Sequence, residues 1–210
     1  MLIYVVVIIL LVAAVAIVSW VSYRRGQEIN WLAIELELDY DPGKDTSGER
    51  YFRETREVAS MLDSRTSTGK SLSGRYRGHR VVVVDIHTSS SSFAMFQLDL
   101  PKRLPVLSIS PVRTKLKWRR RLLFRDISFE SSEFSRKFRV EANDKKFAYD
   151  VCHPRMIEYL LAHPRLMVAI NGSKLALYTS RRWVPKTVKP NLDHLVEVRE
   201  LLPEYLFSRS

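Results

Sequence analysis

The sequence predicts an α+β protein in which an N-terminal transmembrane helix precedes a mostly antiparallel sheet packed with helices. Three observations support this class. Residues 2–22 are almost entirely apolar, β-branched runs joined by short connections begin near residue 72, and helical periodicity returns toward the C-terminus. The 210 residues are enough for about one ordinary domain. We divide the chain into a membrane anchor (1–23), juxtamembrane helices with a linker (24–71) and an α+β domain (72–210).

The anchor is predicted from an apolar segment, residues 2–22, that contains no ionisable acid or base. A helix of about 20 apolar residues spans the hydrocarbon core of a bilayer. A cleaved signal peptide would show a basic start, a shorter apolar core and a small-residue cleavage site, and none of these is clear. Arg24 and Arg25 follow directly, and basic residues beside a span favour the cytoplasmic side. The sequence therefore predicts a single-pass protein of the cell membrane, with its N-terminus outside and its C-terminal domain in the cytoplasm.

The juxtamembrane part is predicted to be helical and then polar. Residues 28–38 place apolar side chains at helical spacings, and the Asp41-Pro42-Gly43 sequence ends that helix. A second helical pattern covers residues 50–62. Residues 64–73 are rich in Ser and Thr and are predicted to form a linker or loop.

The middle of the chain carries the strand patterns. Runs of β-branched and aromatic residues predict strands, and the short connections between them predict antiparallel neighbours. Arg77-Gly78 is the expected turn between the first two, and three prolines bound the last one. The predicted strands are residues 72–77, 79–87, 93–100 and 104–109.

The C-terminal part is predicted to mix short strands with helices. Asn171-Gly172 is a dipeptide that tolerates the positive φ angles of a tight turn, and the apolar runs on either side of it predict a β-hairpin. Pro203 is expected to kink or split the last helix. The predicted elements are strands 138–141, 147–149, 166–170 and 174–178 and helices 153–163 and 193–207.

The formal net charge of +11 favours anionic partners, and the basic excess is concentrated in residues 64–125. One run holds seven cations in thirteen residues: Arg113, Lys115, Lys117, Arg119, Arg120, Arg121 and Arg125. Basic and apolar residues alternate along part of this run, which favours a strand face or a loop over a helix lying in the membrane surface. We interpret the run as a candidate site for anionic lipid headgroups. A solvated surface without a ligand fits the pattern equally well, and binding of nucleic acid fits it less well.

Four segments of the domain are similar to sequences of a known family: residues 74–81, 126–130, 133–140 and 153–158. Over about residues 72–205 the chain resembles a family of prokaryotic membrane-anchored proteins that share a domain of unknown function. The resemblance implies a membrane-tethered domain. It carries no catalytic residues to positions of this chain.

The sequence contains no complete motif for phosphate binding, zinc binding or nucleophilic catalysis. The Thr68-Gly-Lys-Ser71 sequence lacks the earlier glycine of a phosphate-binding loop and is predicted to be a polar loop. Five histidines lack the short paired spacing of a zinc site, and one cysteine excludes an internal disulfide. The adjacent Cys152 and His153 lack the motif of an activated nucleophile. The sequence therefore predicts no cofactor and no metal ion.

These observations predict a binding protein rather than an enzyme. The cytoplasmic α+β domain is expected to bind a protein partner or anionic lipid headgroups at the bilayer. Two alternatives stay open at this point. One is a membrane-tethered enzyme whose site is assembled from dispersed polar residues, and the other is a tethered binder of nucleic acid.

Overall fold

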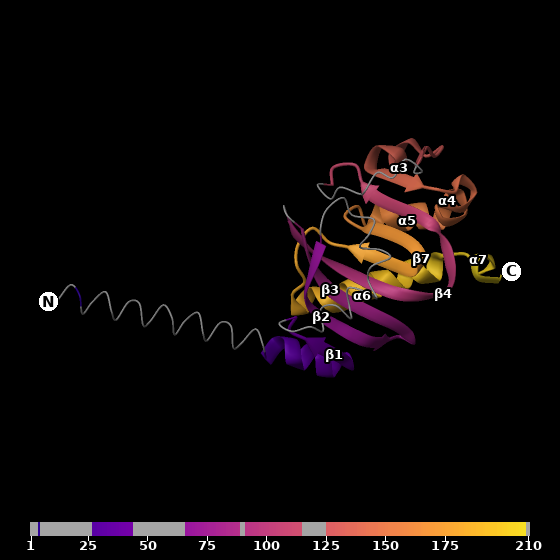
Figure 1. Ribbon diagram of the computed structural model, residues 1–210. Coiled ribbons are helices and arrows are strands. Elements are labelled where there is room, and N and C mark those ends of the chain that lie inside the picture. The colour runs from indigo at the N-terminus through magenta and orange to yellow at the C-terminus, as the bar shows by residue number, and fades with distance from the viewer. Residues whose placement is uncertain (1–3, 5–26, 44–65, 89–90, 115–124, 209–210) are drawn as a thin grey trace.

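The computed structural model describes residue 4 and residues 27–43, 66–88, 91–114 and 125–208 (Figure 1). Three features of the sequence analysis lie wholly or mostly outside these ranges: the anchor, the helix predicted over residues 50–62 and the basic run from Lys115 to Arg121. In the described ranges, no helix combines the length and the hydropathy needed to cross a bilayer.

The described strands form one antiparallel sheet with the order β1-β2-β3-β4-β6-β5, and β7 pairs with β4. Helices pack against this sheet, so the α+β prediction is confirmed. The strands are β1 (Leu38–Asp41), β2 (Thr66–Tyr76), β3 (His79–Thr88), β4 (Ser92–Pro111), β5 (Arg125–Ile127), β6 (Phe138–Ala142) and β7 (Met167–Tyr178). The helices are a segment over residues 27–35, α3 (Ser132–Lys137), α4 (Lys145–Val151), α5 (Pro154–Ala162), α6 (Pro185–Leu201) and α7 (Tyr205–Ser208).

The turn between β2 and β3 follows the prediction. Arg77 and Gly78 both have positive φ angles, 48° and 82°, as the two central residues of a type I′ hairpin turn require. The flanking residues Tyr76 and His79 pair with each other. This hairpin sets the register between β2 and β3 next to the turn.

One bent strand, β4, replaces the two strands that the sequence predicts between residues 93 and 109. The predicted interruption falls where the β4–β7 register shifts, between Asp99 and Leu104 and again before Leu107. Proline has no N–H to donate to a ladder, and Pro101 and Pro105 lie in these irregular stretches. The prolines bend the strand without ending it, because β7 continues along the same edge.

The predicted hairpin at Asn171-Gly172 is wrong. The two runs around this dipeptide belong to one strand, β7, and they pair with different halves of β4 rather than with each other. Gly172 has a φ of 60° and pairs with Leu104 at the bend. The dipeptide therefore supplies the positive φ that the prediction used, but for a bend in a long strand.

Three further segments differ from the prediction. Where the structure describes the linker predicted over residues 64–73, from Thr66 onward, it is the first part of β2, a polar strand held between β1 and β3. The strand predicted over 147–149 is part of α4, whose start is capped by the Asp144 carboxylate accepting from Phe147 N–H at 3.0 Å. The last helix begins at Pro185 instead of residue 193, because a proline in the first turn needs no hydrogen-bond donor. It ends before Pro203, as expected.

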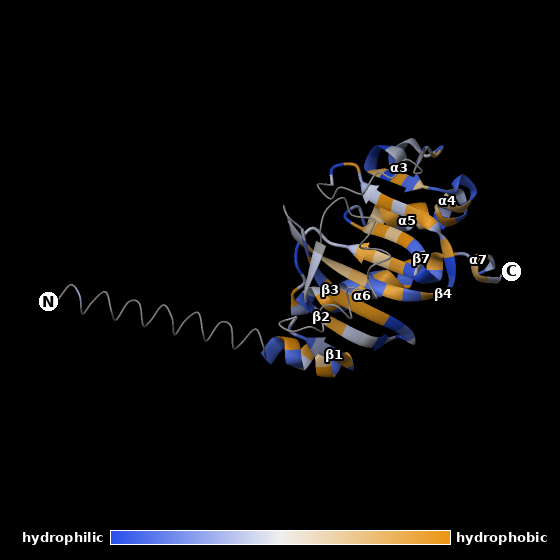
Figure 2. Cartoon of the chain, in the orientation of Figure 1, coloured by the Kyte–Doolittle hydropathy of each residue, from blue (hydrophilic) through white to orange (hydrophobic). Residues whose placement is uncertain are grey.

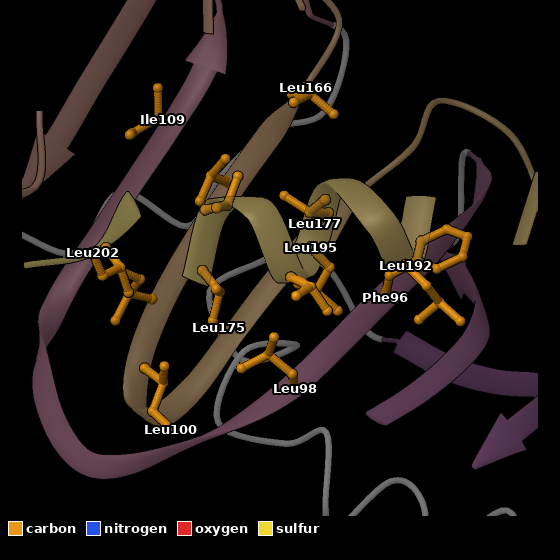
Figure 3. Close-up of a cluster of buried hydrophobic side chains, with 14 of the residues drawn as sticks. Phe96, Leu98, Leu100, Ile109, Leu166, Leu175, Leu177, Leu192, Leu195 and Leu202 are labelled. Carbon is orange, nitrogen blue, oxygen red and sulfur yellow. The ribbon is translucent and has the colours of Figure 1, made fainter. Parts of the chain in front are cut away.

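Both faces of the central strands are buried. Val81 and Val83 belong to the main core cluster, which includes side chains from every helix from α3 to α6, whereas Val82 and Val84 belong to a second cluster on the opposite face. Burial on both faces explains the uninterrupted valine run. Figure 2 shows apolar residues along the central strands, and Figure 3 shows side chains of β4, β7 and α6 in the main cluster. Figure 1 shows α3, α4 and α5 gathered at the end of the sheet farthest from β1.

Candidate functional site

The candidate site is an open pocket between α4, α5 and the segment that joins β5 to α3, which we call the α4–α5 pocket. Its volume is about 610 Å³. Most of its wall is apolar, and its floor includes the buried Cys152. The lining residues are Ser128, Phe129, Glu130, Ser131, Tyr149, Cys152, Pro154, Ile157, Glu158 and Leu161.

The α4–α5 connection places one wall of this pocket. Only Cys152 and His153 separate the two helices, and Pro154 occupies the first turn of α5. Helix α5 then presents Pro154, Ile157 and Leu161 at a spacing of one and two turns. A different face of the same helix carries the fully buried Met156 and Leu160.

Hydrogen bonds and ring contacts fix the opposite wall. The Tyr149 hydroxyl donates to the Ser128 carbonyl at 3.0 Å, which ties the segment after β5 to α4. The Phe129 ring meets the rings of Phe134 and Tyr149 edge-on, with centroids 5.4 and 5.1 Å apart. Ser131 caps α3 by accepting from Phe134 N–H at 3.3 Å. Hydrogen bonds and ring contacts therefore hold the residues of this wall in place.

Two carboxylates give the pocket its electrostatic character. Glu130 and Glu158 are exposed, and they are the charged side chains among the lining residues. Burial raises the pKa of the Cys152 thiol to about 12, so the floor of the pocket stays neutral at physiological pH. An acidic rim in a chain of net charge +11 suits an apolar group that is accompanied by positive charge.

A second polar cluster lies under Trp183. The Asp85 carboxylate is buried and accepts from Trp183 N–H at 3.0 Å. Lys70 Nζ lies 3.8 Å from the Trp183 ring centroid and donates to the Trp183 carbonyl at 3.2 Å. Burial raises the pKa of Asp85, while the Trp183 N–H, Lys70, Arg182 and His87 oppose the rise. These contacts attach the start of α6 to β2 and β3, so we interpret the cluster as structural.

The candidate residues of the basic run are only partly described. Arg113 lies in the turn after β4 and is exposed, and Arg125 is the first residue of β5. Lys115, Lys117 and Arg119 to Arg121 lie outside the described residues. The run as a headgroup site therefore stays a prediction. The predicted loop at Thr68–Ser71 is wrong, because these residues are part of β2.

The α4–α5 pocket was not predicted from the sequence. Residues 126–130 were named there for a family resemblance and residues 153–158 for that resemblance and a helix, and parts of both segments line the pocket. One signal was present in the sequence. Pro154, Ile157, Glu158 and Leu161 follow the i, i+3, i+4, i+7 spacing of a single helix face, separate from the face of Met156. A helix with two apolar faces needs something to cover the second one.

Comparisons with known proteins found a solved structure with a similar fold but did not assign the chain to a family. The chain matches no protein-family model, and no curated protein matches it. Among solved structures, it is similar to the crystal structure of the mycobacterial trehalose monomycolate transport factor A, TtfA. The TM-score is 0.61 at 13% sequence identity, and the match covers 86% of this chain and 95% of that chain. The resemblance to prokaryotic membrane-anchored proteins stays a prediction.

Proposed function

We propose that this chain is a single-pass membrane protein whose cytoplasmic domain docks a partner protein through the α4–α5 pocket. The observation that carries the proposal is the composition of the pocket, which has apolar walls and two carboxylates at its rim. The expected occupant is a segment of the partner that inserts an apolar side chain and places Lys or Arg beside it. An anionic headgroup or a fatty acid would meet repulsion from Glu130 and Glu158.

The anchor supports this proposal from the sequence. Residues 2–22 are long and apolar enough to span a bilayer, and Arg24 and Arg25 favour a cytoplasmic domain. A tether raises the concentration of the domain near other membrane proteins. A shallow contact with one anchoring side chain is then strong enough to hold a partner, although the same contact would be weak in solution.

The structural neighbour bears on the fold. TtfA is named as a transport factor, and its fold covers most of this chain. The proposal that the present chain acts through a partner rests on the pocket.

The first test is peptide binding to the purified full-length chain in detergent micelles. We expect a labelled peptide with a central leucine flanked by lysines to bind, and the same peptide with glutamates in place of the lysines to bind at least tenfold more weakly. Ile157→Glu places a charge in the wall and is expected to abolish binding. The double variant Glu130→Lys/Glu158→Lys is expected to reverse the preference between the two peptides.

A matched control separates the pocket from the general charge of the chain. Glu28 and Glu35 are exposed on the helical segment 27–35, far along the chain from the pocket. Glu28→Lys/Glu35→Lys makes the same charge change and should leave both affinities as they are. Equal binding of the two peptides, or full binding by Ile157→Glu, would contradict the proposal.

The basic run from Arg113 to Arg125 is proposed to have a separate role, which is to bind anionic lipid headgroups. Detergent-free co-sedimentation of the chain without residues 2–22, with vesicles that contain or lack phosphatidylserine, tests this role. If Ile157→Glu, which changes the α4–α5 pocket, weakens vesicle binding, the two surfaces overlap and the docking proposal fails. We expect this variant to bind the vesicles as the parent does.

A further inference from the structure

We propose that a second cavity, which we call the histidine cavity, binds a divalent transition-metal ion of the zinc or nickel type, with His163 and His194 as ligands. It lies between the end of α5, the end of β7 and the middle of α6, and its volume is about 400 Å³. The lining residues are Ala162, His163, Pro164, Arg165, Leu166, Tyr178, Thr179, Ser180, Asn191 and His194.

The two imidazole rings lie close enough to share one ion. Their centroids are 4.6 Å apart and their planes are inclined at 64°. His163 ends α5, and His194 lies in α6. An imidazole nitrogen binds zinc at about 2.0–2.1 Å, so two rings on the same ion must lie within a few ångströms of each other.

Hydrogen bonds around Tyr159 fix the tautomer of both rings. His163 Nδ1 lies 2.9 Å from the Tyr159 carbonyl oxygen, which can only accept, so this nitrogen carries the proton. The Tyr159 hydroxyl gives its single proton to Glu197 Oε2 at 2.5 Å. The Tyr159 oxygen must therefore accept from His194 Nδ1, which lies 2.7 Å away. In the neutral form of each ring, the lone pair is then on Nε2.

This arrangement is typical of histidines that bind metals. Such residues usually donate their other N–H to a carbonyl or, directly or through a relay, to a carboxylate, which orients the ring and raises its basicity. His163 donates to a carbonyl, and His194 reaches the Glu197 carboxylate through Tyr159. No hydrogen bond among the described residues involves either Nε2 atom.

Asn191 offers a third ligand. Its side-chain nitrogen donates to the Thr187 carbonyl at 2.7 Å, which assigns the amide orientation and leaves Oδ1 as an acceptor. Asn191 lies one helical turn before His194 and lines the same cavity. The described residues bring no three His, Cys, Asp or Glu side chains together into a metal cluster. The proposed site therefore uses two imidazoles and an amide oxygen, with water completing the coordination, and its affinity is expected in the micromolar range.

The test is a metal titration of the tag-free full-length chain in detergent, after treatment with EDTA and its removal. We expect one Zn²⁺ or Ni²⁺ ion per chain by calorimetry and no binding of Mg²⁺, which prefers oxygen ligands. His163→Ala and His194→Ala are each expected to weaken binding at least tenfold. His79→Ala removes a histidine at the β2–β3 turn and is the matched control, with no expected change.

Tyr159 is a positioning residue in this proposal. Tyr159→Phe removes the oxygen that holds His194 and is expected to weaken binding by about ten- to a hundredfold. A readout on the unchanged chain covers the case in which a variant does not fold. In nitrogen-detected NMR of the imidazoles, Zn²⁺ should shift the Nε2 signals of two histidines, and the Ala variants identify which two. Affinity weaker than millimolar, or shifts confined to other histidines, would overturn the proposal.

Discussion

Trp183 joins three parts of the fold through different atoms. Its backbone N–H donates to Asp85, its indole N–H donates to the Lys70 carbonyl at 3.3 Å, and its ring meets the Tyr40 ring edge-on at 6.5 Å. The side chain is only 1% exposed. Sequence alone gave no sign of this role, because Trp183 follows two arginines and precedes Val184-Pro185, outside any predicted element.

Trp183→Ala should be among the most damaging single changes in the described core. It creates a large cavity and leaves the Lys70 carbonyl without the indole donor, and truncation of a buried aromatic costs about 3–5 kcal/mol. Urea unfolding followed by circular dichroism measures the loss. Tyr205→Ala is the control, because that ring is 42% exposed and its removal should cost little.

The Asp85 carboxyl makes stability depend on pH. Because burial raises its pKa in the folded chain, the folded state binds a proton more readily than the unfolded state, and the contribution of Asp85 to stability falls as pH rises through that pKa. Asp85→Asn keeps an oxygen for the Trp183 N–H and removes the titration. The difference in free energy of unfolding between this variant and the parent should therefore shift in favour of the variant as the pH rises from 4 to 7. A difference that stays constant across this range would contradict the assignment.

At the scale of elements, the central strands show what could and could not be predicted. The valine run of β3 and the Arg77-Gly78 turn were predicted correctly, because both depend on neighbours in sequence. The course of β7 was not, because Asn171-Gly172 satisfies the local rule for a hairpin and only the distant strand β4 decides otherwise. The pairing of His163 with His194 was missed for the same reason, since two different helices carry them.

Gly172 tests this account of β7. Its φ of 60° is costly for any residue with a side chain, so Gly172→Ala should destabilise the chain by about 1–2 kcal/mol. Ser173→Ala changes the adjacent residue, which has an ordinary φ, and should cost less than half as much. Chemical unfolding of both variants provides the comparison, and equal losses would mean that the bend does not depend on glycine.

At the scale of the whole molecule, the proposals place two surfaces on one domain beside a bilayer. The α4–α5 pocket and the histidine cavity both involve α5, which presents Ile157 to the first and leads into His163 at the second. A ligand in the histidine cavity would therefore contact the end of the helix that forms a wall of the pocket. The peptide assay with and without Zn²⁺ measures any coupling between them.

The orientation of the chain is tested by fusions after Ser210 in a bacterial host. With the domain in the cytoplasm, green fluorescent protein should be fluorescent and should sediment with membranes, whereas alkaline phosphatase should be inactive because its disulfides do not form there. Removal of residues 2–22 should move the fluorescence to the soluble fraction. An active phosphatase fusion would place the domain outside and contradict the proposed topology.

The long β4–β7 pairing also affects how the protein is made. Met95 pairs with Tyr178, so one edge of β4 stays open until residue 178 has left the ribosome. An unpaired strand edge is a template for association with other chains. We therefore expect the nascent domain to need protection by a chaperone until β7 has been synthesised and has paired with β4.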